Sequence, residues 1–197
     1  MVLAWIGVIA ALCLILLSLA HATWRLQIAP TPSSPDARAR IAALVATQLA
    51  ADGCDAPTIF ELGAGWGGLA ARLARMPASA TPCVRGYERS VVPYVVSRVF
   101  RQRAPGLTFH RHDITDAIAE VRAGDVLVCY LCPEQMRRIS AALRARLGDD
   151  PVAVTLISLS FALPGFSPAE TQILPSLYRA RLYRYAVSPG EPQVPLS

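Results

Sequence analysis

Four glycines within six positions follow a short apolar run in residues 59–68, which read IFELGAGWGG. Glycines directly after a buried strand let the backbone turn sharply and approach a ligand where a Cβ would clash. Residues 69–75 fit a helix whose free N–H groups would point at that turn. The run therefore predicts a strand, a ligand-binding turn and a helix in succession.

The rest of the chain predicts alternating strands and helices with short connections. Predicted strands cover residues 58–62, 83–87, 107–110, 126–131 and 152–160, and predicted helices cover 37–50, 69–75, 92–103, 114–120 and 133–147. This alternation is typical of an α/β fold with a mostly parallel, twisted sheet and helices on both faces. After Phe161 we expect a loop with Pro and Gly, and then a last strand at 179–187.

A long apolar segment precedes this pattern. Residues 2–20 contain no charged side chain, and at about 1.5 Å per residue a helix of that length crosses a ~30 Å hydrocarbon layer. We interpret it as a single transmembrane helix. A cleaved secretory signal is the alternative, because Ala20 and Ala22 give an Ala-x-Ala pattern, but no Lys or Arg precedes the segment.

The charges after the segment predict its orientation. Arg25, Arg38 and Arg40 follow it closely, so the globular part is expected on the cytoplasmic side of a single-pass membrane protein. The expected organisation is an anchor at 1–24, a Pro- and Ser-containing linker at 25–36, a domain at 37–190 and a tail at 191–197.

The net charge of +5 comes from arginine alone, since the chain contains no lysine. A basic domain beside a bilayer is attracted to anionic headgroups, so the lipid bilayer is an expected partner. No run of arginines interleaved with aromatic residues marks a nucleic-acid surface, and nucleic acid is not expected. Cys129 and Cys132 form a C-x-x-C without a second pair or a histidine cluster, so no metal site is predicted.

Candidate site residues follow the predicted parallel strands, because ligands of such sheets bind outside the strands' carboxyl ends. Glu61 precedes the glycines, Glu88 ends the second strand, and Asp113 with Ile114 follows the third. Carboxylates there can accept from a ribose, an exocyclic amine or a cationic group. Glu88 and Asp113 are equally compatible with helix caps.

A dinucleotide-binding protein is the main competing interpretation. Gly63, Gly65 and Gly68 satisfy G-x-G-x-x-G, and Glu88 lies 20 residues further on. Glu61 favours the other interpretation, because a carboxylate beside a pyrophosphate is electrostatically unfavourable, whereas it suits an ammonium or a sulfonium.

These motifs resemble the class I S-adenosylmethionine-dependent methyltransferases, in ELGAGWG, GYE and HDI. The resemblance implies a Rossmann-like fold, S-adenosylmethionine as cofactor, and cofactor contacts from Glu61, Gly63, Ala64, Gly65, Trp66, Gly67, Glu88, Asp113 and Ile114. The apolar segment, the Pro93-Tyr94 pair after GYE and the segment DVLVCYLCPEQMRRI look more narrowly like the membrane-anchored protein-lysine methyltransferases. Trp66 departs from that family, which usually has an acidic residue at its position.

Methyl transfer is an in-line displacement, so the protein must hold a neutral nucleophile about 3 to 3.5 Å from the methyl carbon. An apolar channel lowers the pKa of an acceptor amine. Tyr130, Leu131 and Pro133 are the candidates for lining it. The expected function is N-methylation of a lysine in a membrane-associated protein. The alternatives are a lipid or small-molecule methyltransferase, an NAD(P)-binding protein, and a non-catalytic binding module.

Overall fold

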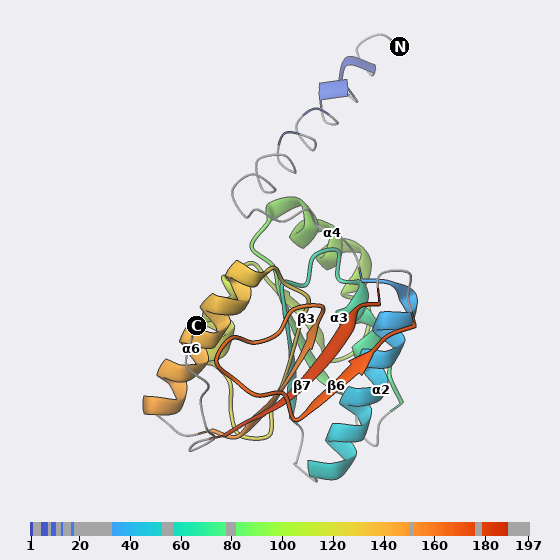
Figure 1. Cartoon of the computed structure of the whole chain (residues 1–197). Coiled ribbons are helices and arrows are strands. Elements are labelled where there is room, and N and C mark those ends of the chain that lie inside the picture. Colours follow the sequence, from blue (N-terminus) through green and yellow to red (C-terminus); the bar gives the residue numbers. More distant parts are fainter. Residues whose placement is uncertain are drawn as a thin grey trace.

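A computed structural model of the chain describes residues 33–52, 57–77, 82–149, 152–175 and 179–188, together with residues 1, 5–7, 9, 10, 13 and 17. In this part of the chain one sheet has the strand order β3-β2-β1-β4-β5-β7-β6 (Figure 1). The strands are β1 (Thr58–Leu62), β2 (Cys83–Tyr87), β3 (Leu107–His110), β4 (Val126–Cys129), β5 (Val154–Leu159), β6 (Glu170–Ile173) and β7 (Arg181–Val187). The helices are α2 (Pro35–Asp52), α3 (Gly68–Leu73), α4 (Val91–Arg101), α5 (Ile114–Ala119) and α6 (Pro133–Asp149).

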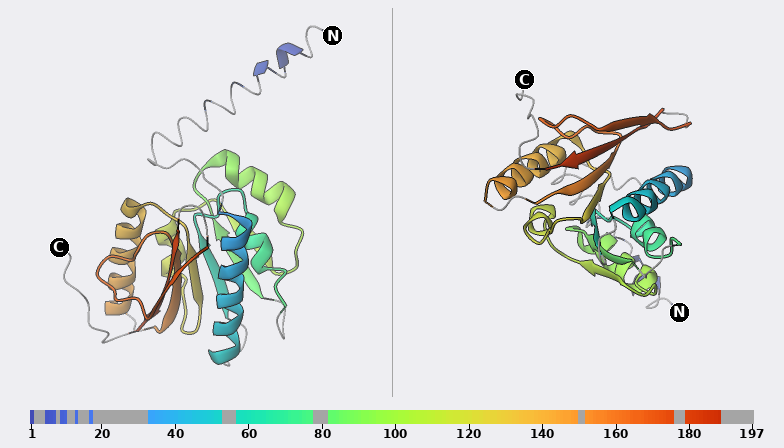
Figure 2. Two further views of the ribbon diagram at one scale, coloured as in Figure 1. Left: turned by 45° about the vertical axis from the view of Figure 1, so that its right-hand side comes forward. Right: turned by 90° about the horizontal axis from the view of Figure 1, so that it is seen from below.

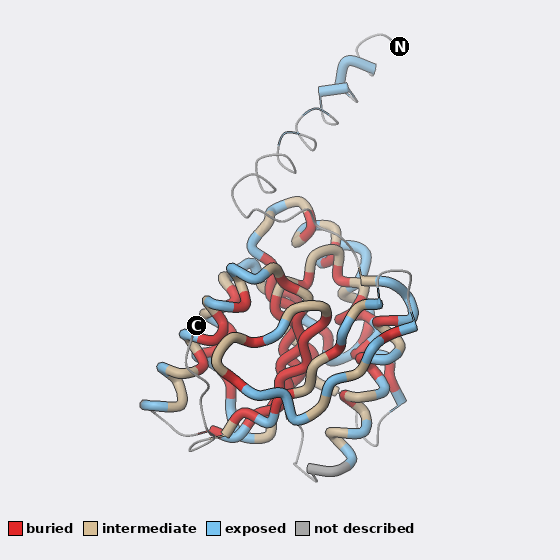
Figure 3. Tube along the Cα trace, viewed as in Figure 1, coloured by how far each residue is buried: buried red, intermediate tan, exposed pale blue. Residues whose placement is uncertain are grey.

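The first five strands are parallel, and helices cover both faces of the sheet (Figure 2). Alternate strand residues point to opposite faces, so Ile59 packs with α2 and α3 while Phe60 packs with α5 and α6. The strands at the centre of the sheet are buried along their length (Figure 3). The predicted α/β architecture is confirmed.

Strand β6 lies in the segment that the sequence predicts as a loop. This strand pairs antiparallel with β7, which pairs antiparallel with β5. It lies at the sheet edge, and its residues alternate between half-buried and exposed. Its sequence, Glu-Thr-Gln-Ile, therefore has little apolar periodicity, and the backbone ladder to β7 defines the strand.

The predicted anchor, most of the linker and the tail at 191–197 lie outside the described residues, apart from scattered positions before residue 20. Among the residues that are described, no helix combines the length and apolarity needed to cross a membrane. The side chains of Trp5, Ile9 and Leu17 are described and exposed.

Asp125 joins two parallel strands at their amino ends. Its Oδ1 accepts from the backbone N–H of Thr58 at 2.8 Å, and its Oδ2 accepts from the N–H of Arg122 at 2.8 Å. The side chain is buried, and it lies before β4, opposite the end that carries the glycines. Asp125 is therefore a structural brace.

We expect Asp125→Ala to lower the free energy of unfolding by about 2 kcal/mol, because two backbone donors lose their acceptor. The thermal midpoint should fall by about 4 to 8 °C in the detergent-solubilised full chain. Glu134→Ala, which removes only an exposed ion pair with Arg137, is the control and should shift the midpoint by less than about 2 °C. Equal midpoints for the two variants would contradict the brace.

Candidate functional site

The loop between β1 and α3 is shaped by glycines with left-handed backbone. Gly63, Gly65 and Gly67 have φ angles of 76°, 53° and 72°. The N–H groups of Gly63 and Ala64 both donate to the carbonyl of Tyr87 at 2.9 Å, which ties the loop to the end of β2. Left-handed conformations of this kind are unfavourable for residues with a Cβ.

The three left-handed glycines have different surroundings. A Cβ on Gly63 would lie 2.5 Å from Leu131 Cδ2, and one on Gly67 would lie 2.7 Å from Phe109 Cζ. A Cβ on Gly65 would meet no heavy atom of the protein within 4 Å. Gly63 and Gly67 are thus required by close packing, whereas Gly65 lies beside open space in which a ligand can approach the backbone.

Glu61 braces the helix that follows the loop. Its side chain is buried, and its Oε2 accepts from the backbone N–H of Ala70 at 2.9 Å. Burial raises the pKa of the Glu61 carboxyl from 4.5 to about 8. The hydrogen bond from Ala70 lowers this pKa, the charge of Glu88 raises it, and the charge of Arg38 lowers it. A cation in this site would stabilise the ionised form.

Glu88 holds the glycine loop from the second strand. Its Oε2 accepts from the N–H of Gly65 at 2.8 Å, and its Oε1 accepts from the N–H of Ser90 at 2.6 Å. The side chain is buried. Each carboxylate oxygen can accept more than one hydrogen bond, so Glu88 can brace the loop and still accept from ligand hydroxyls beside Gly65.

Asp113 is the N-cap of α5. Its Oδ1 accepts from the Thr115 N–H at 3.1 Å and from Arg138 Nη2 at 2.9 Å, and Arg89 Nη1 lies 3.4 Å from its Oδ2. Burial acts to raise the pKa of Asp113, but the hydrogen bonds from Thr115 and Arg138 outweigh it and hold the pKa below its usual range. Asp113 is thus an ionised helix cap, and Ile114 beside it is buried.

These acids lie at neighbouring strand ends. Leu62 of β1 pairs with Tyr87 of β2, and Tyr87 pairs with His110 of β3. Glu61, Glu88 and Asp113 belong to or follow these three ends. The structure therefore brings the predicted acids to the same edge of the sheet as the glycine loop.

The residues predicted to line an acceptor channel follow β4 at the same edge. Leu131 is buried and packs on Gly63. Tyr130 is half-buried against the core on the side of α2 and α3, and exposed Pro133 begins α6. Ala64 is buried in the loop, and Trp66 is half-buried.

Two features of this edge were missed in the sequence. Ser160 follows β5 with a φ of 71°, and its N–H donates to the carbonyl of Arg181 at 2.7 Å. Nothing in the residue type indicates that conformation. Arg89 and Arg138 of α6 both contact Asp113, and neither was a candidate site residue in the sequence. Contacts between residues 25 or more positions apart, such as Arg138 with Asp113, carry no local signal.

No protein-family model matches the chain, and no curated protein matches it. Solved structures do resemble it. An RNA methyltransferase from Salinibacter ruber in complex with S-adenosyl-L-homocysteine has a TM-score of 0.60 at 22% identity, covering 85% of this chain and 99% of its own. Magnesium protoporphyrin IX methyltransferase from Synechocystis PCC 6803 with bound SAM has a TM-score of 0.51 at 19% identity, covering 79% and 86%.

A third similar structure is precorrin 8w decarboxylase from Methanobacterium thermoautotrophicum, with a TM-score of 0.54 at 16% identity and coverage of 80% and 93%. All three identities lie below 25%, so they establish a shared fold and leave the reaction to be argued from the site. The chain has a Rossmann-like fold, which it shares with these two methyltransferases and the decarboxylase.

Proposed function

We propose that this protein is an S-adenosylmethionine-dependent N-methyltransferase tethered to a membrane, and that it acts on a lysine of a membrane-associated protein. Methyltransferase activity is supported by three acids, Glu61, Glu88 and Asp113, which surround a glycine loop that is open at Gly65. Similar folds hold S-adenosylmethionine or its demethylated product, which supports the same cofactor here.

The site residues fit this cofactor. Glu88 has acceptor capacity for the two ribose hydroxyls, and its contact with the Gly65 N–H keeps it beside the open space. The buried Glu61 complements a positively charged ligand, because such a ligand offsets the cost of ionising a buried carboxylate. A pyrophosphate would instead add negative charge near Glu61 and Glu88, which disfavours the dinucleotide alternative.

When bound, the cofactor would supply an electrophilic methyl group on its sulfonium. The protein's own residues then have to orient an acceptor amine and keep it unprotonated. Tyr130, Leu131 and Pro133 are our candidates for that role, because they follow β4, Leu131 packs on Gly63, and their side chains are mostly apolar. Exclusion of water by such residues lowers the amine pKa, so no dedicated general base is required.

The membrane part of the proposal is supported by the sequence. Nineteen uncharged residues at 2–20 precede a short linker, and arginines follow them. A tether of this length confines the domain to acceptors close to the bilayer, which raises their effective concentration. A membrane-associated protein fits that geometry, and a membrane lipid is the runner-up acceptor.

The acceptor class can be tested with S-adenosylmethionine labelled in its methyl group and membranes that contain the full chain. We expect label in a protein band, at a lysine located by mass spectrometry. Gly65→Ala should reduce incorporation by about tenfold, since the added Cβ strains the left-handed backbone and enters the open space. Label confined to the lipid extract would overturn the lysine proposal, and no label in either fraction would overturn methyl transfer.

The Glu61 carboxyl should make both folding stability and stabilisation by S-adenosylmethionine depend on pH. Its folded pKa, about 8, exceeds the unfolded value of 4.5, so its contribution to stability is fully present below pH 4.5 and is lost as the pH rises through 8. A cationic ligand favours the ionised form and lowers that pKa. The stabilisation by S-adenosylmethionine should therefore grow with pH across this window.

Glu61→Gln keeps an acceptor for the Ala70 N–H but cannot ionise. We expect its unliganded thermal midpoint to decline less than that of the wild type between pH 6 and pH 9. We also expect its ligand-induced shift to rise less with pH. Any titration of S-adenosylmethionine itself affects the wild type and Glu61→Gln equally. The difference between their two pH profiles therefore reports the ionisation of Glu61 alone. Parallel pH profiles would show that this carboxyl does not titrate as described.

A further inference from the structure

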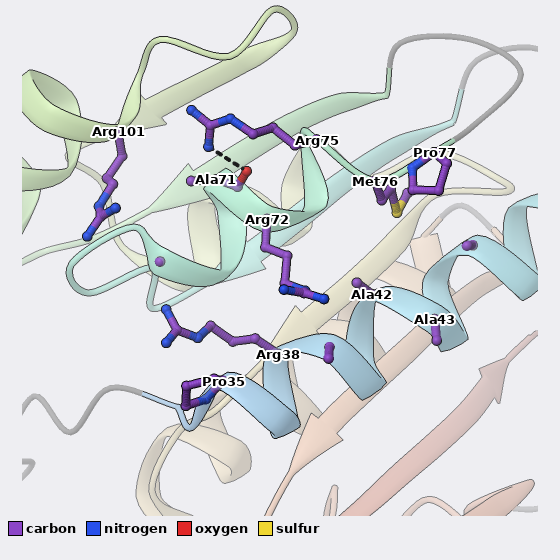
Figure 4. A pocket seen from close by; sticks show the side chains of 13 residues that line it. Pro35, Arg38, Ala42, Ala43, Ala71, Arg72, Arg75, Met76, Pro77 and Arg101 are labelled. Atoms are coloured by element: carbon purple, nitrogen blue, oxygen red, sulfur yellow. Dashed lines mark hydrogen bonds between the residues drawn. The ribbon is translucent and has the colours of Figure 1, made fainter.

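A pocket of about 700 Å³ lies between α2 and α3, outside the glycine loop (Figure 4). Small side chains open this space, since positions 39, 42, 43 and 46 of α2 are all alanine and share one helix face. Ala71 lines it from α3. The space between α2 and α3 therefore exists because the residues that face it have small side chains.

Four arginines line this pocket, and we call it the arginine pocket: Arg38, Arg72, Arg75 and Arg101. Figure 4 shows Arg38 and Arg72 lying in the space between the helices, with Arg101 extending from the end of α4. Among the described residues, no carboxylate lies within 4.0 Å of any of these four guanidinium groups. Arg38 interacts electrostatically with the more distant Glu61, and Arg75 Nη1 donates to the carbonyl of Ala71 at 2.9 Å. Four like charges without a contacting carboxylate favour a bound anion, and guanidinium groups match phosphate oxygens in geometry.

The adjoining helix α4 exposes an apolar stripe. Val91, Val95 and Val99 recur at every fourth position and are 46%, 47% and 56% exposed, and Phe100 is 64% exposed. We call these four residues the α4 stripe. Arg98 is also exposed on this helix, and Arg101 at its end lines the arginine pocket. An apolar helix face bordered by arginines is typical of a helix that lies in a membrane interface.

We propose that this surface docks the domain on an anionic membrane, with a phospholipid phosphate in the arginine pocket and the α4 stripe in the headgroup region. The inference rests on the proposed membrane tether. Pro35, where the linker enters α2, lines the same pocket. Pro35 lies fifteen positions after Ala20, so the pocket lies within about 50 Å of the end of the apolar segment. A nucleic acid would use the arginines but would leave the aliphatic stripe in water.

The test uses the full chain in nanodiscs and measures the thermal midpoint of the domain without S-adenosylmethionine, so that it is independent of methyl transfer. Discs of phosphatidylcholine alone are compared with discs that contain phosphatidylglycerol. We expect a midpoint about 5 °C higher in the anionic discs, and we expect high salt to remove the gain. Arg72→Gln with Arg101→Gln should abolish the gain. Arg122→Gln, an exposed arginine outside the pocket, should retain it.

Substitutions in the α4 stripe test whether this apolar face also contacts the membrane. Val95→Ser with Val99→Ser should reduce the gain in anionic discs while leaving the midpoint in phosphatidylcholine discs unchanged, because both side chains are exposed. An equal gain in all variants would overturn the inference. So would the same gain from inorganic phosphate or from a short RNA in phosphatidylcholine discs, because the ligand would then be another anion. A chain that does not enter discs would refute the tether and the docking together.

Discussion

The glycine loop depends on acceptors supplied by two adjacent strands. The carboxylate of Glu88 and the carbonyl of Tyr87, both at the end of β2, hold the N–H groups of Gly65, Gly63 and Ala64. Glu61 of β1 holds the start of α3 through Ala70. These hydrogen bonds keep the backbone in its left-handed turns and leave one glycine beside open space. The register of β1 on β2 is thus what creates the binding edge.

The same acids serve structure and binding. Burial raises the pKa of Glu61 to about 8, and the charge of the neighbouring Glu88 adds to this shift. A bound cation would offset both effects and favour the ionised carboxylate. Asp113 is stabilised in its ionised form by a helix N-terminus and by Arg138. A sheet edge that holds carboxylates in this arrangement is better suited to a nucleoside with positive charge than to a pyrophosphate. The negative charge of the site, rather than the glycine pattern, therefore favours S-adenosylmethionine over a dinucleotide as the ligand.

Much of the fold was accessible from the sequence because its strands and helices alternate with strong apolar patterns. The glycine loop and the acids at the strand ends were also predictable, since each occurs at a fixed place after an apolar run. The edge strand β6 was not, because its Glu-Thr-Gln-Ile sequence relies on pairing with β7. The left-handed Ser160 and the contact of Arg138 with Asp113 depend on residues distant in sequence. The arginine pocket likewise arises only when α2, α3 and α4 are packed together.

The central claim is that the loop between β1 and α3 binds a nucleoside sulfonium. The most direct measurement is the affinity of the detergent-solubilised full chain for S-adenosylmethionine and for NAD by titration calorimetry. We expect saturable binding of S-adenosylmethionine and none of NAD at the same concentrations, and we expect Glu88→Ala to lower the affinity. Binding of NAD in preference to S-adenosylmethionine, or binding of neither, would contradict it.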